Sequence, residues 1–216
     1  AMGIYALDSC TTGQRNTGFG YYTGHLISSG EDNVALGHAA LHNNETGDDN
    51  VAVGYAALYD CTGANNIAIG YDSGRAGSPG GNITTASNRI VLGNNNHTSA
   101  HIKIDWTVTS DERDKMNFAE VPHGLSFVND LQPVKFDFKK SRDDETPHGK
   151  TKYGFKAQDI LALEGDNPII IDNDNEENLK VTNSHLIPVL VKAIQELTDQ
   201  NKKLTSRIEE LEKENN

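Results

Sequence analysis

Ser110 and Lys115, five positions apart, carry a hydroxyl and an amine that could act together as a nucleophile and its base. A serine hydroxyl is a weak nucleophile near neutral pH and needs an adjacent base, and a desolvated lysine can be that base where no histidine is placed. On spacing alone, a helix N-cap at Ser110-Asp111 followed by a solvated lysine is favoured instead.

Three segments further along the chain change that interpretation. They are Leu131-Gln-Pro-Val-Lys-Phe136, Tyr153-Gly-Phe-Lys-Ala-Gln-Asp-Ile160 and His185-Leu-Ile-Pro-Val-Leu-Val-Lys-Ala-Ile-Gln-Glu-Leu197. Together with residues 110–115, and in this order, they resemble the endosialidase-type intramolecular chaperone domain at the C-terminus of phage tailspikes and tail fibres. The resemblance extends over residues 110–216. It implies a serine peptidase with a Ser-Lys dyad that cleaves its own chain once.

The opening motif carries the most specific part of this resemblance. In that family it reads Ser-Asp-x-Arg-Leu-Lys, with the serine as nucleophile, the lysine as its partner and cleavage just before the serine. The matching residues here are Ser110, Asp111, Arg113 and Lys115. The implied cleavage site lies between Thr109 and Ser110, with Asp111 and Arg113 as supporting residues. Asp114 departs from the pattern, because a carboxylate beside the lysine favours the charged amine, and this predicts slow or absent cleavage.

The elements that precede this site form a repeat array. Its unit is Asn, aliphatic, Ala, aliphatic, Gly. Copies begin at Asn33, Asn50 and Asn66, with degenerate copies at Asn16 and Asn88, so successive starts lie 17, 17, 16 and 22 residues apart. The alternation predicts a short strand in each unit, and the glycine that follows marks a corner. The corner glycines are Gly37, Gly54, Gly70 and Gly93. The small alanine implies close approach of a neighbouring chain segment, as in a narrow solenoid.

These repeats resemble the head repeats of trimeric autotransporter adhesins, over about Asn16 to Gly93. The resemblance implies a trimeric β-roll, and one short strand buries too little apolar area to offset its ordering entropy without stacking and trimerisation. The alternation in residues 101–109 predicts a closing strand. We therefore expect a mainly β fibre or receptor-binding region at 1–109 and an α+β chaperone domain at 110–216. The predicted core of that domain comprises Phe118, Leu125, Phe127, Val128, Leu131, Phe136 and Phe138.

Aromatic side chains in the first half are candidates for sugar binding, because an aromatic face suits the apolar face of a pyranose. The candidates are Tyr21, Tyr22, Tyr55, Tyr71 and Trp106. Packing of these rings against the neighbouring coil is the favoured alternative. The loop from Asp72 to Ala86 is longer than its counterparts and is the better place to look for a binding surface.

The C-terminal segment, residues 185–214, predicts a coiled-coil helix that holds several chains together. Its apolar residues recur at 3-4 spacing with one asparagine in the series. The series is Ile187, Leu190, Ile194, Leu197, Asn201, Leu204, Ile208 and Leu211. Ile and Leu at these positions favour a two-stranded coiled coil, whereas the family resemblance implies a homotrimer. We favour the homotrimer. The alternative is a helix that packs only on its own domain.

Composition and charge exclude several classes of protein. The formal net charge is −12, and the sequence has no stripe of basic residues, which argues against nucleic acid as a partner. No window reaches the roughly 20 apolar residues that cross a bilayer, so we expect no membrane insertion. Cys10 and Cys61 stand outside any metal-binding spacing and are predicted to be free thiols, and the eight histidines are scattered. We predict no metal and no cofactor.

These observations together predict the distal part of a viral tail fibre or spike that attaches to the host surface. It would be made in the host cytoplasm and carried on the virion, would bind a cell-surface glycan or receptor, and would lose its chaperone after cleavage. One alternative is a non-enzymatic trimeric adhesin with an uncleaved trimerisation domain. A glycan-degrading spike is disfavoured, because the repeat half lacks paired carboxylates on an obvious cleft.

Overall fold

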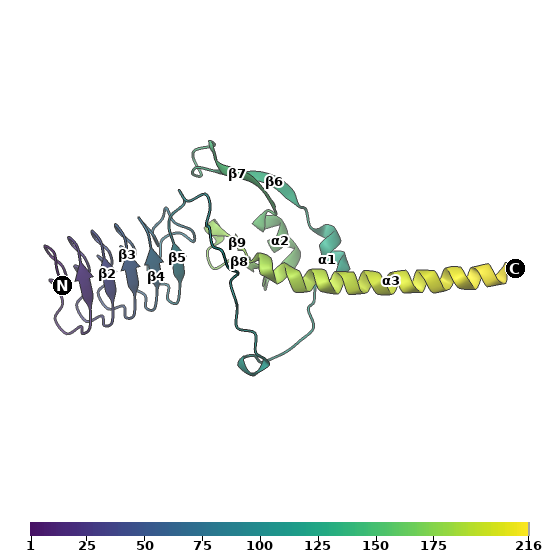
Figure 1. The fold of residues 1–216 in the computed structure, drawn as a ribbon, viewed down its shortest axis with the longest axis horizontal. Helices are drawn as coiled ribbons and strands as arrows, with labels where there is room; N and C mark the ends of the chain where they lie inside the picture. The colour runs from purple at the N-terminus through teal and green to yellow at the C-terminus, as the bar shows by residue number, and fades with distance from the viewer. Residues whose placement is uncertain (216) are drawn as a thin grey trace. The chain divides into compact units, whose positions relative to one another are not determined.

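The computed structural model describes residues 1–215, which divide into two compact units. The first contains Ala1–Ala100 together with Phe138–Lys150, and the second contains residues 101–137 and those from Thr151 onward. The first half of the chain is a β-solenoid, a small α+β region follows, and a long helix ends the chain (Figure 1). The fold class predicted from the repeats and the heptads is therefore confirmed.

The solenoid has five three-residue strands in one parallel sheet, in chain order (Figure 1). They are β1 (Thr17–Phe19), β2 (Val34–Leu36), β3 (Val51–Val53), β4 (Ile67–Ile69) and β5 (Ile90–Leu92). Each strand pairs with its counterpart one repeat later, and a bridge from Met2 to Phe19 adds a rung before β1.

The register of the last coil differs by one residue from the prediction. Ile67 pairs with Ile90, so this coil is 23 residues long rather than 22. Arg89, not Asn88, stands in the place of the repeat asparagine, and its N–H donates to Asn66 Oδ1 at 3.0 Å. Strand pairing decides the register, because a slip by one residue would turn Val91 from the interior to the outer face.

In the middle strands of the solenoid, the residue that faces the interior is small. Ala35, Ala52 and Ala68, in the middle of their strands, are fully buried, whereas the aliphatic residues on either side point outward. These outward residues are half-buried in β2 and β3 and exposed in the last coil, where Ile90 is 71% exposed. Because the larger aliphatics lie outside, the single chain carries an apolar strip along its sheet.

Both cysteines lie in the solenoid and are free thiols, as predicted. Cys61 is fully buried among the interior residues, and this burial raises the pKa of its thiol. The thiol is therefore protonated near neutral pH and contributes as a small apolar group that fills the interior.

The repeat asparagines form a buried ladder that satisfies the interior turns. Asn50 Nδ2 donates to Asn33 Oδ1 at 3.1 Å and to Gly63 O at 2.9 Å. Its Oδ1 accepts from the N–H and the Nδ2 of Asn66, at 3.0 and 3.1 Å. Each asparagine thus joins its own coil to the coils before and after it.

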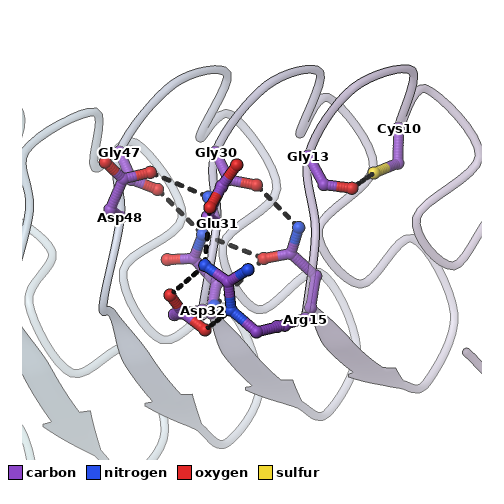
Figure 2. Close-up of polar contacts among 10 residues, drawn as sticks. Cys10, Gly13, Arg15, Gly30, Glu31, Asp32, Gly47 and Asp48 are labelled. Carbon is purple, nitrogen blue, oxygen red and sulfur yellow. Dashed lines mark hydrogen bonds and ion pairs between the residues drawn. The ribbon is translucent and has the colours of Figure 1, made fainter.

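On the outside of the same turns, charged side chains join neighbouring coils. Figure 2 shows Arg15 reaching from one coil to Glu31 and Asp32 of the next, with Arg15 Nη2 at 2.6 Å from the Glu31 carboxylate. The Arg15 hydrogen bond lowers the pKa of Asp32. These groups are exposed, and solvent screening keeps such a pair to a small contribution.

Asn50→Ala is expected to lower the free energy of unfolding by about 2 kcal/mol, because Asn66 N–H loses its acceptor inside the solenoid. Chemical denaturation followed by circular dichroism measures the change. Asn96→Ala, in an exposed loop, is the matched control and should change stability little. Equal stabilities for the Asn50 and Asn96 variants would contradict the role of the ladder.

The α+β region packs short elements around one apolar cluster. Its helices are α1 (Leu125–Asp130) and α2 (Ala157–Glu164), and its strands are β6 (Val134–Lys139), β7 (Pro147–Gly154), β8 (Ile171–Asp172) and β9 (Lys180–Val181). The 3₁₀ turns are η1 (Glu112–Asp114), η2 (Glu176–Asn178) and η3 (Asn183–His185). β6 pairs with β7, and β8 pairs antiparallel with β9. The cluster comprises Phe127, Leu131, Ile160, Ile170, Ile171, Leu186 and Val189.

Two predictions about this region are wrong. Residues 101–109 form no strand, and their four alternating apolar side chains, Ile102, Ile104, Trp106 and Val108, are exposed. Such alternation is typical of a strand that pairs with a neighbour, and no strand among residues 1–215 pairs with this segment. Phe118 and Phe138, predicted to lie in the core, are also exposed, and only Phe127 and Leu131 of the predicted set are buried.

The C-terminal helix α3 (Leu186–Glu214) uses two different faces. Leu186, Val189 and Ala193 are buried, while Lys192 Nζ donates to Val121 O at 2.6 Å and Glu196 Oε2 accepts from Leu125 N at 2.7 Å. The predicted heptad stripe, Ile187, Leu190, Ile194, Leu197, Asn201, Leu204, Ile208 and Leu211, is exposed. The helix therefore packs on its own domain through residues outside the stripe.

No helix among residues 1–215 is long and apolar enough to cross a membrane.

Candidate active site

Ser110 and Lys115 are brought together by the single 3₁₀ turn η1. Asp111 is the N-cap of this turn, and its carboxylate accepts the Arg113 N–H at 2.9 Å. The Asp114 N–H donates to Asp111 O and the Lys115 N–H donates to Glu112 O, both at 3.1 Å. The turn reverses the chain, so the lysine side chain returns toward the serine that precedes the cap.

The two side chains predicted to react are in hydrogen-bond contact. Lys115 Nζ lies 2.7 Å from Ser110 Oγ. This distance is within the reach required for a base to take the hydroxyl proton when the amine is neutral. The contact between these two side chains is thus already present in one chain.

Asp111 and Arg113 form a fork beside the dyad. Arg113 Nε lies 3.0 Å from Asp111 Oδ1, and Arg113 Nη2 lies 2.6 Å from Asp111 Oδ2. The Arg113 side-chain hydrogen bond, followed by that of its backbone N–H, lowers the pKa of Asp111. The Asp111 contact raises the pKa of Arg113 in turn. Among the described residues, neither the Asp111 nor the Arg113 side chain makes a hydrogen bond or ion pair with Ser110 or Lys115. The Asp111–Arg113 pair therefore stabilises the turn itself.

The site lies in water in the single chain. Every residue from His101 to Glu120 is exposed, including Thr109, Ser110 and Lys115. General-base catalysis by a lysine needs surroundings that disfavour its charge, and burial supplies them. The single chain therefore has the contact that the chemistry needs but lacks the dry surroundings.

Asp114 is the residue where the motif departs from the family pattern. Its backbone N–H takes part in the turn, and among residues 1–215 no ion pair joins its carboxylate to Lys115. In the single chain the Asp114 carboxylate and the Lys115 amine are therefore exposed neighbours without a direct contact.

The candidate sugar-binding tyrosines lie on the outer corners of the solenoid, where aromatic rings stack from coil to coil. Tyr21 stacks on His38 at 5.3 Å between ring centroids, His38 on Tyr55 at 5.0 Å, and Tyr55 on Tyr71 at 5.0 Å. The neighbouring rings cover both faces of Tyr55, so a sugar would reach only its edge. Tyr22 lies against Tyr5, with centroids 4.8 Å apart. Trp106 is 78% exposed and belongs to the other unit.

Histidines in this aromatic column were not singled out from the sequence. His38 and Tyr55 each follow a corner glycine, and His42 stacks on Tyr59 with centroids 4.7 Å apart. The repeat pattern could have indicated them, because His38 and Tyr55 share one position of the repeat and His42 and Tyr59 share another.

The long loop from Asp72 to Ala86 is folded onto the solenoid. Ile83 is buried in the interior cluster, and Ser78 Oγ accepts from Gly74 N at 3.1 Å. The loop therefore extends the last full coil.

No group of three or more His, Cys, Asp or Glu side chains in the described chain could hold a metal ion.

In chain order, the structure is thus a β-solenoid followed by a small α+β region that opens on a contact between a serine and a lysine. Residues 110–166 match the family described as chaperone of endosialidase, and the match begins at Ser110. It covers 57 of the 216 residues. Comparison with curated proteins and with solved structures gave no match. The match supports a chaperone-type domain of a self-cleaving peptidase class in the second half of the chain.

Proposed function

We propose that this chain is the distal part of a viral tail fibre or spike, whose C-terminal chaperone drives trimeric folding and is released by cleavage between Thr109 and Ser110. The observation that carries the proposal is the 2.7 Å contact between Lys115 Nζ and Ser110 Oγ, at the residue where the family match begins. The contact joins a nucleophile to its base directly beside the peptide bond to be cut.

The cleavage proceeds within one chain. Ser110 Oγ bonds to the carbonyl carbon of Thr109 while Lys115 takes the hydroxyl proton, and the C–N bond to Ser110 breaks as that proton passes to the leaving nitrogen. The product is an ester of Thr109 on the Ser110 side chain with a free α-amino group. Water then hydrolyses the ester, which yields a Thr109 carboxylate and restores the serine. Direct attack of water on the peptide carbonyl is the alternative route.

Assembly supplies the dry environment that the single chain lacks. The dyad is exposed in one chain, and other copies packed around residues 101–120 would bury the lysine and favour its neutral form. Cleavage then reports that the chains have assembled. Release of the chaperone leaves the shaft unable to refold once it unfolds, which makes its stability kinetic.

Two exposed apolar surfaces support a homotrimer. One is the outward aliphatic strip on β1–β5, and the other is the heptad stripe of α3. Apolar surfaces of this extent on a soluble chain mark association sites. Because the stripe residues repeat at 3-4 spacing in identical chains, a parallel bundle of copies buries them together.

Leu204→Asp is expected to raise the dissociation constant of the trimer at least about tenfold, because it places a carboxylate in the bundle core. Residues 198–215 are all exposed in the single chain, so this change leaves the fold of the monomer intact. Ser206→Asp, on the opposite side of the same helix, is the matched control. Sedimentation equilibrium measures the dissociation constant of both variants, and equal association of the two would contradict the proposed helix bundle.

Host attachment belongs to residues 1–109 in this proposal. Glycans or a receptor meet the exposed edges of Tyr21, Tyr22, Tyr55 and Tyr71, and Trp106 offers an open ring face. No nucleic acid or membrane takes part. The fibre is carried on the virion after assembly in the host cytoplasm.

One alternative is favoured by the solvent exposure of the dyad and by Asp114: a non-enzymatic trimeric adhesin whose trimerisation domain stays attached. Both functions need the second half for assembly, and only the first cuts the chain. Asp114 would then account for slow or absent cleavage.

The experiment that tests the proposal compares the assembly of three proteins in cells. The full chain should form trimers, the chain ending at Thr109 should stay monomeric or aggregate, and Ser110→Ala should form trimers that remain whole. Light scattering after size-exclusion chromatography gives the molar masses. Trimers formed equally well by the chain ending at Thr109 would rule out the chaperone role.

A further inference from the structure

The turn that presents Lys115 has almost nothing to hold it except its own hydrogen bonds. All residues from His101 to Glu120 are exposed, so no packed side chain fixes this segment to the core. A single 3₁₀ turn forms poorly without such support, because one or two hydrogen bonds do not offset the ordering of its residues. The distance between Lys115 Nζ and Ser110 Oγ therefore depends on whatever stabilises the turn.

Asp111 supplies that stabilisation through two contacts. Its Oδ1 accepts the Arg113 N–H at 2.9 Å, which satisfies a donor at the start of the turn. Its two oxygens also receive Arg113 Nε and Nη2, at 3.0 and 2.6 Å. The guanidinium keeps the pKa of Asp111 low, so the cap is charged near neutral pH and is lost only as the pH falls through that lowered value.

We infer that Asp111 is a positioning residue for self-cleavage: by capping the turn Glu112–Asp114 it sets the Lys115 amine against the Ser110 hydroxyl. This inference rests on the proposed cleavage. Asp111 itself does not contact either reacting group, and its effect passes through the backbone of the turn. Arg113 acts through Asp111 and has the smaller role, because its side chain is 88% exposed and the backbone cap survives without it.

If Asp111 positions the lysine in this way, variants of the turn should cleave at rates that follow a defined order. Asp111→Ala in the full chain is expected to cleave about five- to tenfold more slowly, since losing an N-cap lowers the population of the turn by about that factor. Asp111→Asn keeps the accepting oxygen and should stay within about twofold of wild type. Arg113→Ala should also stay within about twofold, and Asp105→Ala, an exposed aspartate outside the turn, is the control.

The pH profile separates positioning from direct chemistry. Asp111→Ala should lower the cleavage rate by the same factor at every pH above about 5, where the wild-type cap is charged, without moving the midpoint of the profile. A midpoint that moves would mean that the carboxylate acts on the lysine electrostatically, which would overturn the inference. Equal slowing by the alanine and asparagine variants would overturn it too.

A second readout does not depend on cleavage, and so separates failure of this inference from failure of the proposed function. In Ser110→Cys, a nearby lysine ammonium favours the thiolate and speeds alkylation by iodoacetamide. Peptide mapping follows the introduced thiol apart from Cys10 and Cys61. Adding Asp111→Ala should slow alkylation to the level of Ser110→Cys with Lys115→Ala, and Asp111→Asn should not. An alkylation rate that Asp111→Ala leaves unchanged would refute the positioning role, even if the wild type were never cut.

Discussion

Lys115→Ala is expected to leave the full chain in one piece, with a cleavage rate reduced by roughly a hundredfold or more. The lysine amine, 2.7 Å from Ser110 Oγ, is the only base in contact with that hydroxyl among residues 1–215. Without it the serine keeps its proton and remains a poor nucleophile. Denaturing electrophoresis of the assembled protein over time measures the fraction cut.

Two further variants make this result interpretable. Ser110→Ala should be equally uncut, because the nucleophile is gone. Lys103→Ala removes an exposed lysine a few residues before the cleavage site and should cut at the wild-type rate. If Lys115→Ala were cut as fast as Lys103→Ala, the lysine would have no part in the reaction. Sedimentation of each variant confirms that a loss of cutting is not a loss of assembly.

Gly54→Ala is expected to lower the free energy of unfolding by about 4 kcal/mol, the largest stability effect of any single change proposed for this chain. Gly54 has φ +133°, a conformation that L side chains rarely adopt. A Cβ at this position would also lie 2.4 Å from the carbonyl oxygen of Gly70 on the next coil. Because that obstacle is backbone in a stacked ladder, relief requires the coils to separate.

Gly77→Ala is the matched control, since a Cβ there meets nothing within 4 Å. It should change stability by no more than about 0.5 kcal/mol. Thermal unfolding followed by circular dichroism compares the two variants. A Gly54 variant as stable as the Gly77 variant would mean that the coils do not stack as closely as the solenoid requires.

Much of the solenoid was predictable because its repeat is short and its chemistry is repeated. The alternation of aliphatic residues with alanine indicated the strands, and the corner glycines have the positive φ that their positions require. Alternation cannot say which side is inside, and here Ala35 and Ala52 face the interior while the aliphatic residues beside them in the strands point outward. The last register was misplaced because Asn88 resembles the repeat asparagine, whereas pairing of Ile67 with Ile90 sets it.

The candidate site was predictable at the level of its two reacting residues, and less so in how they meet. The bare spacing suggested a helix capped by Ser110-Asp111, and a cap is indeed present, but it belongs to Asp111 and starts one turn only. That turn brings Lys115 back to Ser110. The expected strand before the site is not formed, and its apolar residues, such as Ile104 and Trp106, are exposed among the described residues. Contacts between copies do not appear in a pattern read along a single sequence.

The most direct test of the account is the intact mass of the wild-type protein after assembly. Self-cleavage at the proposed bond predicts two products, one that ends at Thr109 and one that begins at Ser110, whose masses together exceed that of the whole chain by one water. A single mass for the uncut chain in assembled trimers, or a cut at any other bond, would contradict it.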